Sequence, residues 1–254
     1  MIIDCHGHCS IDGSYHLSAD DTVRSLDLYG IDKICCSAPI SSGEATPDRV
    51  RQRNDLILAS MKKHPDRIMG MCFVNPGYFR ETQDEITRCV VDNGMVGIKL
   101  YHQYRINEPV QFPLIERCIE LGVPILMHAG YPAAPELRER QPRISMGPHF
   151  ADVAKHYPEA MLICGHIGGG GDWERQLKAL REAPSVYLDT SGSVIDAGMI
   201  ERCVRELGID RLLFACDGSM ERGLGKIADA NLTKSQRAKL YSQNFLQILA
   251  RRTP

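Results

Sequence analysis

Residues 2–8 read IIDCHGH, an apolar run that ends on two histidines separated by one glycine. Side chains alternate across a β-strand, so His6 and His8 are expected on the face that Asp4 shares, and Cys5 on the opposite face, toward helices. A strand that is apolar along its length and polar at its carboxyl end is typical of parallel sheets covered by helices. The stretch therefore predicts the first strand of such a sheet.

Short apolar runs rich in β-branched residues recur along the chain, each bounded by Gly, Pro, Asn or Asp. They predict eight strands: Ile2–Cys5, Lys33–Ala38, Ile68–Val74, Val96–Tyr101, Pro124–His128, Met161–His166, Val186–Asp189 and Arg211–Asp217. Amphipathic stretches lie between them. Ser18 opens a helix that ends at Gly30, and Thr46 with Pro47 opens another that stops before Pro65.

The alternation of strands and helices determines the predicted architecture. Such strands pair in parallel through right-handed crossovers, and eight units in about 250 residues have the size of a closed barrel. We therefore predict one (β/α)8 TIM barrel that forms a single domain over residues 1–254. An open doubly wound sheet is the alternative, but no G-x-G-x-x-G motif follows the first strand.

Charge and hydropathy exclude two classes of partner. The formal net charge is −2 and the isoelectric point is about 6.5, so no broad positive field attracts nucleic acid or anionic lipid. The chain starts without a secretory signal, and no run is long and apolar enough to span a bilayer. We expect a cytoplasmic protein with reduced, buried cysteines that acts on a small molecule.

Polar residues stand at the carboxyl ends of several predicted strands, where the active site of a (β/α)8 barrel lies. They are His6, His8, Lys99, His128, His166 and Asp217. Imidazole and carboxylate ligands suit zinc, iron or manganese, usually with one position kept for water. Because buried polar groups need partners, so many of them at one rim are hard to explain by packing. The set predicts a site for a divalent ion.

The same residues stand in motifs that resemble the amidohydrolase superfamily, and within it the amidohydrolase-related branch that includes aminocarboxymuconate semialdehyde decarboxylase. The resemblance covers nearly the whole chain and rests on DCHGH at 4–8, GIKL at 97–100, MHAG at 127–130, GHIGGG at 165–170, CD at 216–217 and Asn244. It implies a barrel of the metal-dependent hydrolase type with one ion, commonly zinc. The implied ligands are His6, His8, His128 and Asp217, with His166 beside the bound water or itself a ligand.

The reaction predicted from this resemblance is hydrolysis. In this hypothesis the ion activates a bound water, Asp217 accepts its proton, and His166 orients it for attack on a small ester, lactone or amide. The first alternative is non-oxidative decarboxylation of a phenolic or enoic acid, in which the ion holds the carboxylate and a proton replaces carbon dioxide. The second alternative is an inactive barrel that acts as a binding protein.

Lys99 decides how many ions are expected. Alternation turns its side chain into the barrel, where an unpaired ammonium is costly. Some members of the superfamily carboxylate a lysine in this strand, so that it bridges two ions. We expect one ion, with Lys99 paired to Asp4 or Asp189 or anchoring a substrate carboxylate. A second ion bridged by carboxylated Lys99 is the alternative.

The loops that follow the strands are expected to supply the substrate contacts. The longest, residues 130–147, carries Tyr131 and Arg143, and Arg222 follows the last strand. Guanidinium groups pair well with carboxylates, so these residues predict a small anionic substrate. The resemblance is also compatible with a homodimer, and manganese or iron are the alternatives to zinc.

Overall fold

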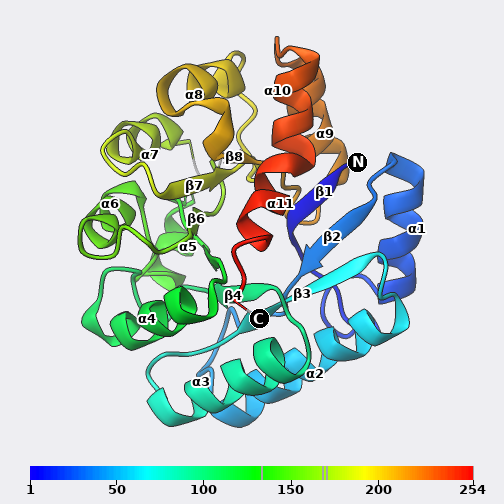
Figure 1. The fold of residues 1–254 in the computed structure, drawn as a ribbon, viewed down its shortest axis with the longest axis vertical. Coiled ribbons are helices and arrows are strands. Elements are labelled where there is room, and N and C mark those ends of the chain that lie inside the picture. Colours follow the sequence, from blue (N-terminus) through cyan, green and yellow to red (C-terminus); the bar gives the residue numbers. More distant parts are fainter. Residues whose placement is uncertain (133, 168, 170, 254) are drawn as a thin grey trace.

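One parallel sheet organises the chain. The computed structural model describes residues 1–132, 134–167, 169 and 171–253, so Gly168 and Gly170 of the glycine run lie outside the described residues. Eight strands pair in the order β1 to β8 (Figure 1). Their bounds are β1 Ile3–Gly7, β2 Lys33–Cys36, β3 Ile68–Phe73, β4 Gly97–Leu100, β5 Ile125–Met127, β6 Leu162–Cys164, β7 Val186–Asp189 and β8 Leu212–Leu213. All the predicted strands are present.

Helices surround this sheet (Figure 1). They are α1 Ala19–Tyr29, α2 Pro47–Lys63, α3 Phe79–Ile86, α4 Phe112–Leu121, α5 Pro135–Arg140, α6 Gly147–His156, α7 Trp173–Leu180, α8 Met199–Leu207, α9 Met220–Asp229, α10 Lys234–Ala238 and α11 Asn244–Leu249. The predicted caps form: the Ser18 side chain accepts a hydrogen bond from the backbone of Asp21, and Gly30 ends α1 in a left-handed conformation.

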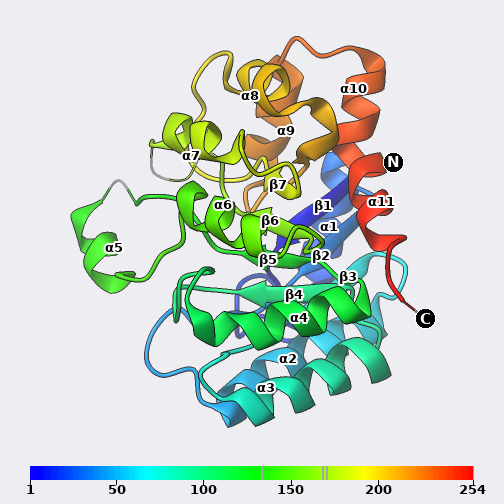
Figure 2. The ribbon, with the colours of Figure 1, turned by 60° about the vertical axis from the view of Figure 1, so that its left-hand side comes forward.

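Hydrogen bonds just beyond β8 close the sheet into a barrel. The backbone N–H of Cys5 donates to the Phe214 carbonyl at 3.0 Å, and the N–H of Asp217 donates to the His6 carbonyl at 2.8 Å. The (β/α)8 barrel predicted from the sequence is therefore confirmed, and the open doubly wound alternative is wrong. Figure 2 shows α5 standing away from the barrel wall, on the segment between β5 and α6.

A β-bulge in β1 sets the direction of its side chains. Asp4 pairs with Ile34 and Gly7 with Cys36, so Cys5 and His6 together oppose the single residue Cys35. The bulge interrupts the alternation, and Ile3 and Cys5 join the apolar cluster inside the barrel instead of facing the helices. The predicted common face of Asp4 and His6 is wrong for the same reason. A glycine is required at position 7, because a Cβ there would lie 2.3 Å from the Ile34 side chain.

Two apolar layers lie on either side of the sheet. The larger one joins the outer face of the strands to the helices, for example Ile98 to Ile115 and Leu162 to Leu177. The smaller one fills the amino-terminal part of the barrel, where α11 packs its residues against the strand interiors. Members of this inner layer include Ile3, Met71, Leu126, Ile163, Leu213, Phe245 and Ile248. The carboxyl ends of the strands are left for polar side chains.

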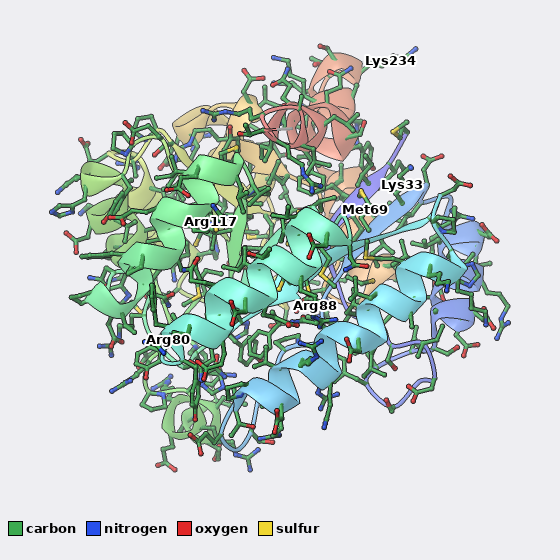
Figure 3. The ribbon with its side chains drawn as sticks, turned by 60° about the horizontal axis from the view of Figure 1, so that its bottom comes forward. Lys33, Met69, Arg80, Arg88, Arg117 and Lys234 are labelled. Carbon is green, nitrogen blue, oxygen red and sulfur yellow. The ribbon has the colours of Figure 1, made fainter. Side chains whose placement is uncertain are left out.

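Charged side chains cover the outer helices (Figure 3). Arg88, which follows α3, bonds Glu85 at 2.6 Å and Asp55 of α2 at 2.7 Å, so it ties two neighbouring helices together. All ten cysteines are free and buried. None of the helices that the structure describes has the length and hydropathy needed to cross a membrane.

Candidate active site

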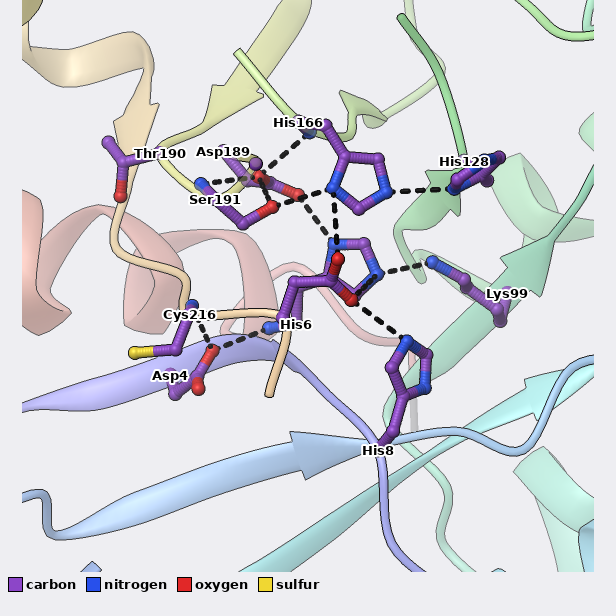
Figure 4. Close-up of polar contacts among 12 residues, drawn as sticks. Asp4, His6, His8, Lys99, His128, His166, Asp189, Thr190, Ser191 and Cys216 are labelled. Atoms are coloured by element: carbon purple, nitrogen blue, oxygen red, sulfur yellow. Dashed lines mark hydrogen bonds and ion pairs between the residues drawn. The ribbon is translucent and has the colours of Figure 1, made fainter. Parts of the chain in front are cut away.

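His6 and His8, at the end of β1, lie in a cluster of polar side chains (Figure 4), and Asp217 follows β8. Asp217 Oδ1 lies 3.0 Å from His8 Nε2 and 3.6 Å from His6 Nε2. These donor atoms all lie within 4.8 Å of one another, a spacing that could accommodate one metal ion. Of the ligands that the resemblance implied, the structure thus brings together His6, His8 and Asp217.

The outer nitrogens of both histidines fix which ring atom faces Asp217. His6 Nδ1 lies 2.8 Å from the carboxylate of Asp189, and His8 Nδ1 lies 2.9 Å from the Ser37 carbonyl. Both partners only accept hydrogen bonds, so each Nδ1 carries the proton and each Nε2 of a neutral ring has a lone pair. Burial lowers the pKa of His6 to about 3, which keeps this ring neutral.

The resulting donor set fits a divalent cation. Burial raises the pKa of Asp217, but the imidazoles of His166, His6 and His8 outweigh this effect and hold the pKa well below its usual range. An ionised carboxylate beside imidazole nitrogens is a set of ligand atoms that divalent ions accept in proteins. Neutral imidazoles whose other nitrogen bonds a carboxylate or a carbonyl are also typical of metal ligands.

His128 is placed differently from the other expected ligands. Its Nδ1 lies 2.8 Å from His166 Nε2, its Nε2 lies 3.2 Å from the acceptor Oε1 of Gln141, and its ring stacks on Tyr101 at 4.2 Å. Burial lowers the pKa of His128 well below its usual range, so the ring is neutral. It is not one of the residues that converge on Asp217, and its role as a fourth ligand stays a prediction.

Lys99 points into the barrel, as the alternation predicts, and is fully buried. Its Nζ lies 2.5 Å from His6 Nε2, and no ion pair joins it to Asp4 or Asp189 among the described residues. Burial lowers the pKa of Lys99 to about 8. His6 Nε2 has one lone pair, so it cannot accept from Lys99 and bind an ion at the same time.

Asp189, at the end of β7, organises the site in a way that the sequence did not predict. Its Oδ2 accepts from His6 Nδ1, and its Oδ1 accepts the backbone N–H of His166 at 3.0 Å. Burial raises its pKa, but His6 and the hydrogen bonds to the carboxylate hold the pKa well below its usual range. The sequence contained a signal for this role, because β7, like the other strands of the site, ends on a polar residue.

Backbone strain marks the same rim. Three described residues other than glycine have a positive φ: His16 at 64°, His166 at 65° and Asp217 at 51°. His166 and Asp217 follow β6 and β8, and the His166 Nδ1 lies 3.4 Å from Asp217 Oδ2. Such conformations cost about 1–3 kcal/mol each and cluster at functional sites, where the surroundings enforce them.

A pocket of about 410 Å³ opens above these residues. It is lined by His128, Ala129, Gly130, Pro132, Ala134, Leu137, Gln141, Ile144, His166, Gly169, Gly192, Ser193, Cys216, Asp217 and Arg222. Of the three predicted substrate contacts, only Arg222 lines it. The Tyr131 ring stacks under Arg138, and Arg143 bonds the Gln103 carbonyl at 3.3 Å, so the structure places both of these outside the pocket.

Comparison with known proteins identifies the family. The amidohydrolase family matches residues 3–244. Gamma-resorcylate decarboxylase of Polaromonas sp. (strain JS666 / ATCC BAA-500) is 25% identical over 252 residues, which cover 80% of this chain and 77% of that protein. The 2-amino-3-carboxymuconate-6-semialdehyde decarboxylase of Dictyostelium discoideum is 23% identical over 140 residues, 49% of this chain and 39% of that protein.

A solved structure shares the fold. The dihydroxybenzoic acid decarboxylase from Polaromonas sp. JS666, with bound manganese and the inhibitor 2-nitroresorcinol, superposes with a TM-score of 0.76 at 19% identity. The match covers 98% of this chain and 96% of that chain. That structure holds manganese, so the specific expectation of zinc gains no support from it.

These relatives correct the predicted reaction. The prediction of a hydrolase is wrong, because the two sequence relatives named above are decarboxylases, and the alternative of decarboxylation agrees better with them. The error has a chemical cause: the same imidazoles and carboxylate serve both reactions, so the ligand motifs do not separate them. The match to the family and these two relatives show that the chain belongs to the amidohydrolase family, in the amidohydrolase-related branch.

Proposed function

We propose that the protein is a metal-dependent, non-oxidative decarboxylase of a small phenolic or enoic acid. The observation that carries this proposal is the convergence of the His6 and His8 Nε2 atoms on the ionised Asp217. The decarboxylase relatives supply the reaction class. The proposal rests on both together, because the ligand set alone is shared with hydrolases.

One divalent ion is proposed to lie between His6, His8 and Asp217, with His128 as a further ligand. When bound, the ion holds the substrate carboxylate together with a neighbouring oxygen and stabilises the charge that develops on the substrate. Manganese is the first ion to test, because a relative with this fold holds it. The Lys99 ammonium has to leave His6 Nε2 when the ion binds there.

The proton that replaces carbon dioxide has to come from the pocket. When the carbon–carbon bond breaks, its electron pair stays on the substrate carbon, which then takes up one proton. Among the lining residues, His166 and Asp217 are acid–base groups that lie side by side, with 3.4 Å separating Nδ1 from Oδ2. We therefore assign the delivery of this proton to the His166–Asp217 pair.

The rest of the pocket suits a small acid with an apolar body. Its volume of about 410 Å³ lies in the usual range for small-molecule sites, about 300–1,000 Å³. Ala129, Pro132, Leu137 and Ile144 form an apolar wall, and Arg222 supplies a guanidinium. No described residue makes a hydrogen bond or an ion pair with Arg222, so it is available for a second acidic or hydroxyl group of the substrate.

The test is a substrate screen with the manganese-loaded protein. Hydroxybenzoates, unsaturated dicarboxylates, aryl esters and lactones are each incubated in water enriched in oxygen-18. We expect carbon dioxide from one or more of the acids, with no oxygen-18 in the organic product. Hydrolysis of the esters or lactones with uptake of oxygen-18, and no carbon dioxide from any acid, would contradict the proposal.

A further inference from the structure

We propose that Ser191 is a positioning residue of this site: its hydroxyl fixes the proton of His166 on Nδ1 and so sets the orientation of the ring. The inference rests on the proposed function only in taking His166 as a residue of the reaction. Ser191 is almost fully buried and does not line the pocket, so it acts through His166 and not on the substrate.

The direction of the Ser191 hydroxyl follows from its two neighbours. Ser191 Oγ lies 2.6 Å from Asp189 Oδ1 and 2.9 Å from His166 Nδ1 (Figure 4). Asp189 is ionised and can only accept, and a serine hydroxyl has one hydrogen to donate. The short contact to the carboxylate takes this hydrogen, because a hydrogen bond to a charged group is the stronger one. Ser191 Oγ is thus left as an acceptor toward His166.

His166 has to donate a hydrogen bond to this acceptor. Its Nδ1 faces Ser191 Oγ and also Asp217 Oδ2, at 2.9 and 3.4 Å, so both partners on this side accept. His166 therefore carries a proton on Nδ1, whether its ring is neutral or charged.

The backbone around Ser191 is held as firmly as its hydroxyl. Its own N–H donates to Asp189 Oδ1 at 2.9 Å. Lys226 of α9 donates from Nζ to the carbonyls of Thr190, Ser191 and Gly192, at 3.0, 3.2 and 2.7 Å. A loop fixed at each of these points keeps Ser191 Oγ in place for His166, which is the condition for a positioning role.

The experiment combines kinetics with nitrogen-15 NMR on the full-length protein. Ser191→Ala removes the acceptor, Ser191→Thr keeps a hydroxyl, and Ser60→Ala removes a buried serine hydroxyl from α2 as a matched control. We expect kcat for decarboxylation to fall between about tenfold and a hundredfold in Ser191→Ala, with KM nearly unchanged. Ser191→Thr should recover most of this loss, and Ser60→Ala should keep the kcat of the wild type.

The NMR spectrum reads the tautomer directly and needs no turnover. In the wild type, before and after loading with diamagnetic zinc, His166 should show a protonated Nδ1. Ser191→Ala should show a mixture of tautomers. A wild-type ring without a proton on Nδ1, or a Ser191→Ala variant with unchanged tautomer and kcat, would overturn the inference. If no acid is decarboxylated at all, the proposed function fails, while the tautomer still decides this inference.

Discussion

The two ends of the barrel interior use the same strands for opposite purposes. At the amino-terminal end, Leu126 and Ile163 pack against Phe245 of α11 in a closed apolar layer. At the carboxyl end the polar groups of His6, Lys99 and Asp189 are buried as deeply as those apolar side chains. The amino-terminal (lower) half is stabilised by apolar burial, and the carboxyl-terminal (upper) half is held by hydrogen bonds and ion pairs among its buried polar groups.

The features that lower the stability of this protein lie at the carboxyl end of the barrel, beside the candidate active site. The positive φ values of His166 and Asp217 and the buried ammonium of Lys99 all lie at the carboxyl end. Each of them is unfavourable by itself. We therefore expect substitutions at the upper end to change activity more than stability, and substitutions at the lower end to do the reverse.

Asp217→Asn is the change with the largest expected effect. It removes the charge that faces His6 and His8 and also one partner of the His166–Asp217 pair. The rate of decarboxylation should fall by roughly a thousandfold or more, since acid–base groups alone contribute about 10²–10⁴-fold. Circular dichroism should show an intact fold. Retention of a tenth of the wild-type activity would remove Asp217 from the site.

Phe245→Ala tests the lower half. This ring is 1% exposed and lies in the inner apolar layer, so truncation leaves a cavity. The free energy of unfolding, measured by urea denaturation, should fall by about 3–5 kcal/mol. The kcat of the remaining folded protein should stay within about twofold of the wild type, because the substitution lies in the amino-terminal layer and the active site at the carboxyl end. A large loss of kcat without loss of stability would refute that separation.

Replacing Lys226 should have a smaller effect on the free energy of unfolding, and this effect should depend on pH. Burial lowers the pKa of Lys226 to about 8, whereas an unfolded lysine keeps its proton to about pH 10.4. Between these values the unfolded state binds more protons than the folded state, so the free energy of unfolding increases with pH in this window. Below pH 8 the amine is charged in both states, and the full cost of burying that charge lowers the free energy of unfolding.

The measurement is the difference between the wild type and Lys226→Met in urea denaturation from pH 7 to pH 10. The wild type should gain relative to the variant by up to about 1.4 kcal/mol per pH unit above pH 8. A difference that stays flat over this range would show that the three carbonyls keep the ammonium charged, and the depressed pKa would be rejected.

Lys99→Met has the smallest predicted effect and addresses the number of ions. The ammonium and the proposed ion compete for His6 Nε2, so the variant should bind manganese roughly severalfold more tightly by calorimetry, because a like charge is removed. Elemental analysis should give one equivalent of metal for both proteins. Two equivalents in the wild type and one in the variant would instead establish Lys99 as a bridge between ions.

The barrel could be predicted from the sequence because each of its signals is local. The helix start at Ser18 and stop at Gly30 appear where the pattern places them. The bulge in β1 could not be predicted, since two residues opposite Cys35 are a property of strand pairing and not of residue type. The predicted direction of Cys5 was wrong for that reason.

The active site also has some features that the sequence predicts and others that only coordinates show. His6, His8 and Asp217 could be predicted to lie near one another, because the carboxyl ends of barrel strands share one rim. The roles of Asp189 and Ser191 depend on which atom faces which, and that requires coordinates. The reaction could not be read from the ligands, because a polarising ion with imidazole neighbours serves hydrolysis and decarboxylation equally.

The most direct test of the central claim is a crystal structure of the protein soaked in manganese, with diffraction data collected near the manganese absorption edge. We predict one anomalous peak within coordination distance, about 2.0–2.3 Å, of His6 Nε2, His8 Nε2 and Asp217 Oδ1. A fully soaked crystal without a peak at these atoms, or with its ion bound elsewhere, would contradict the account.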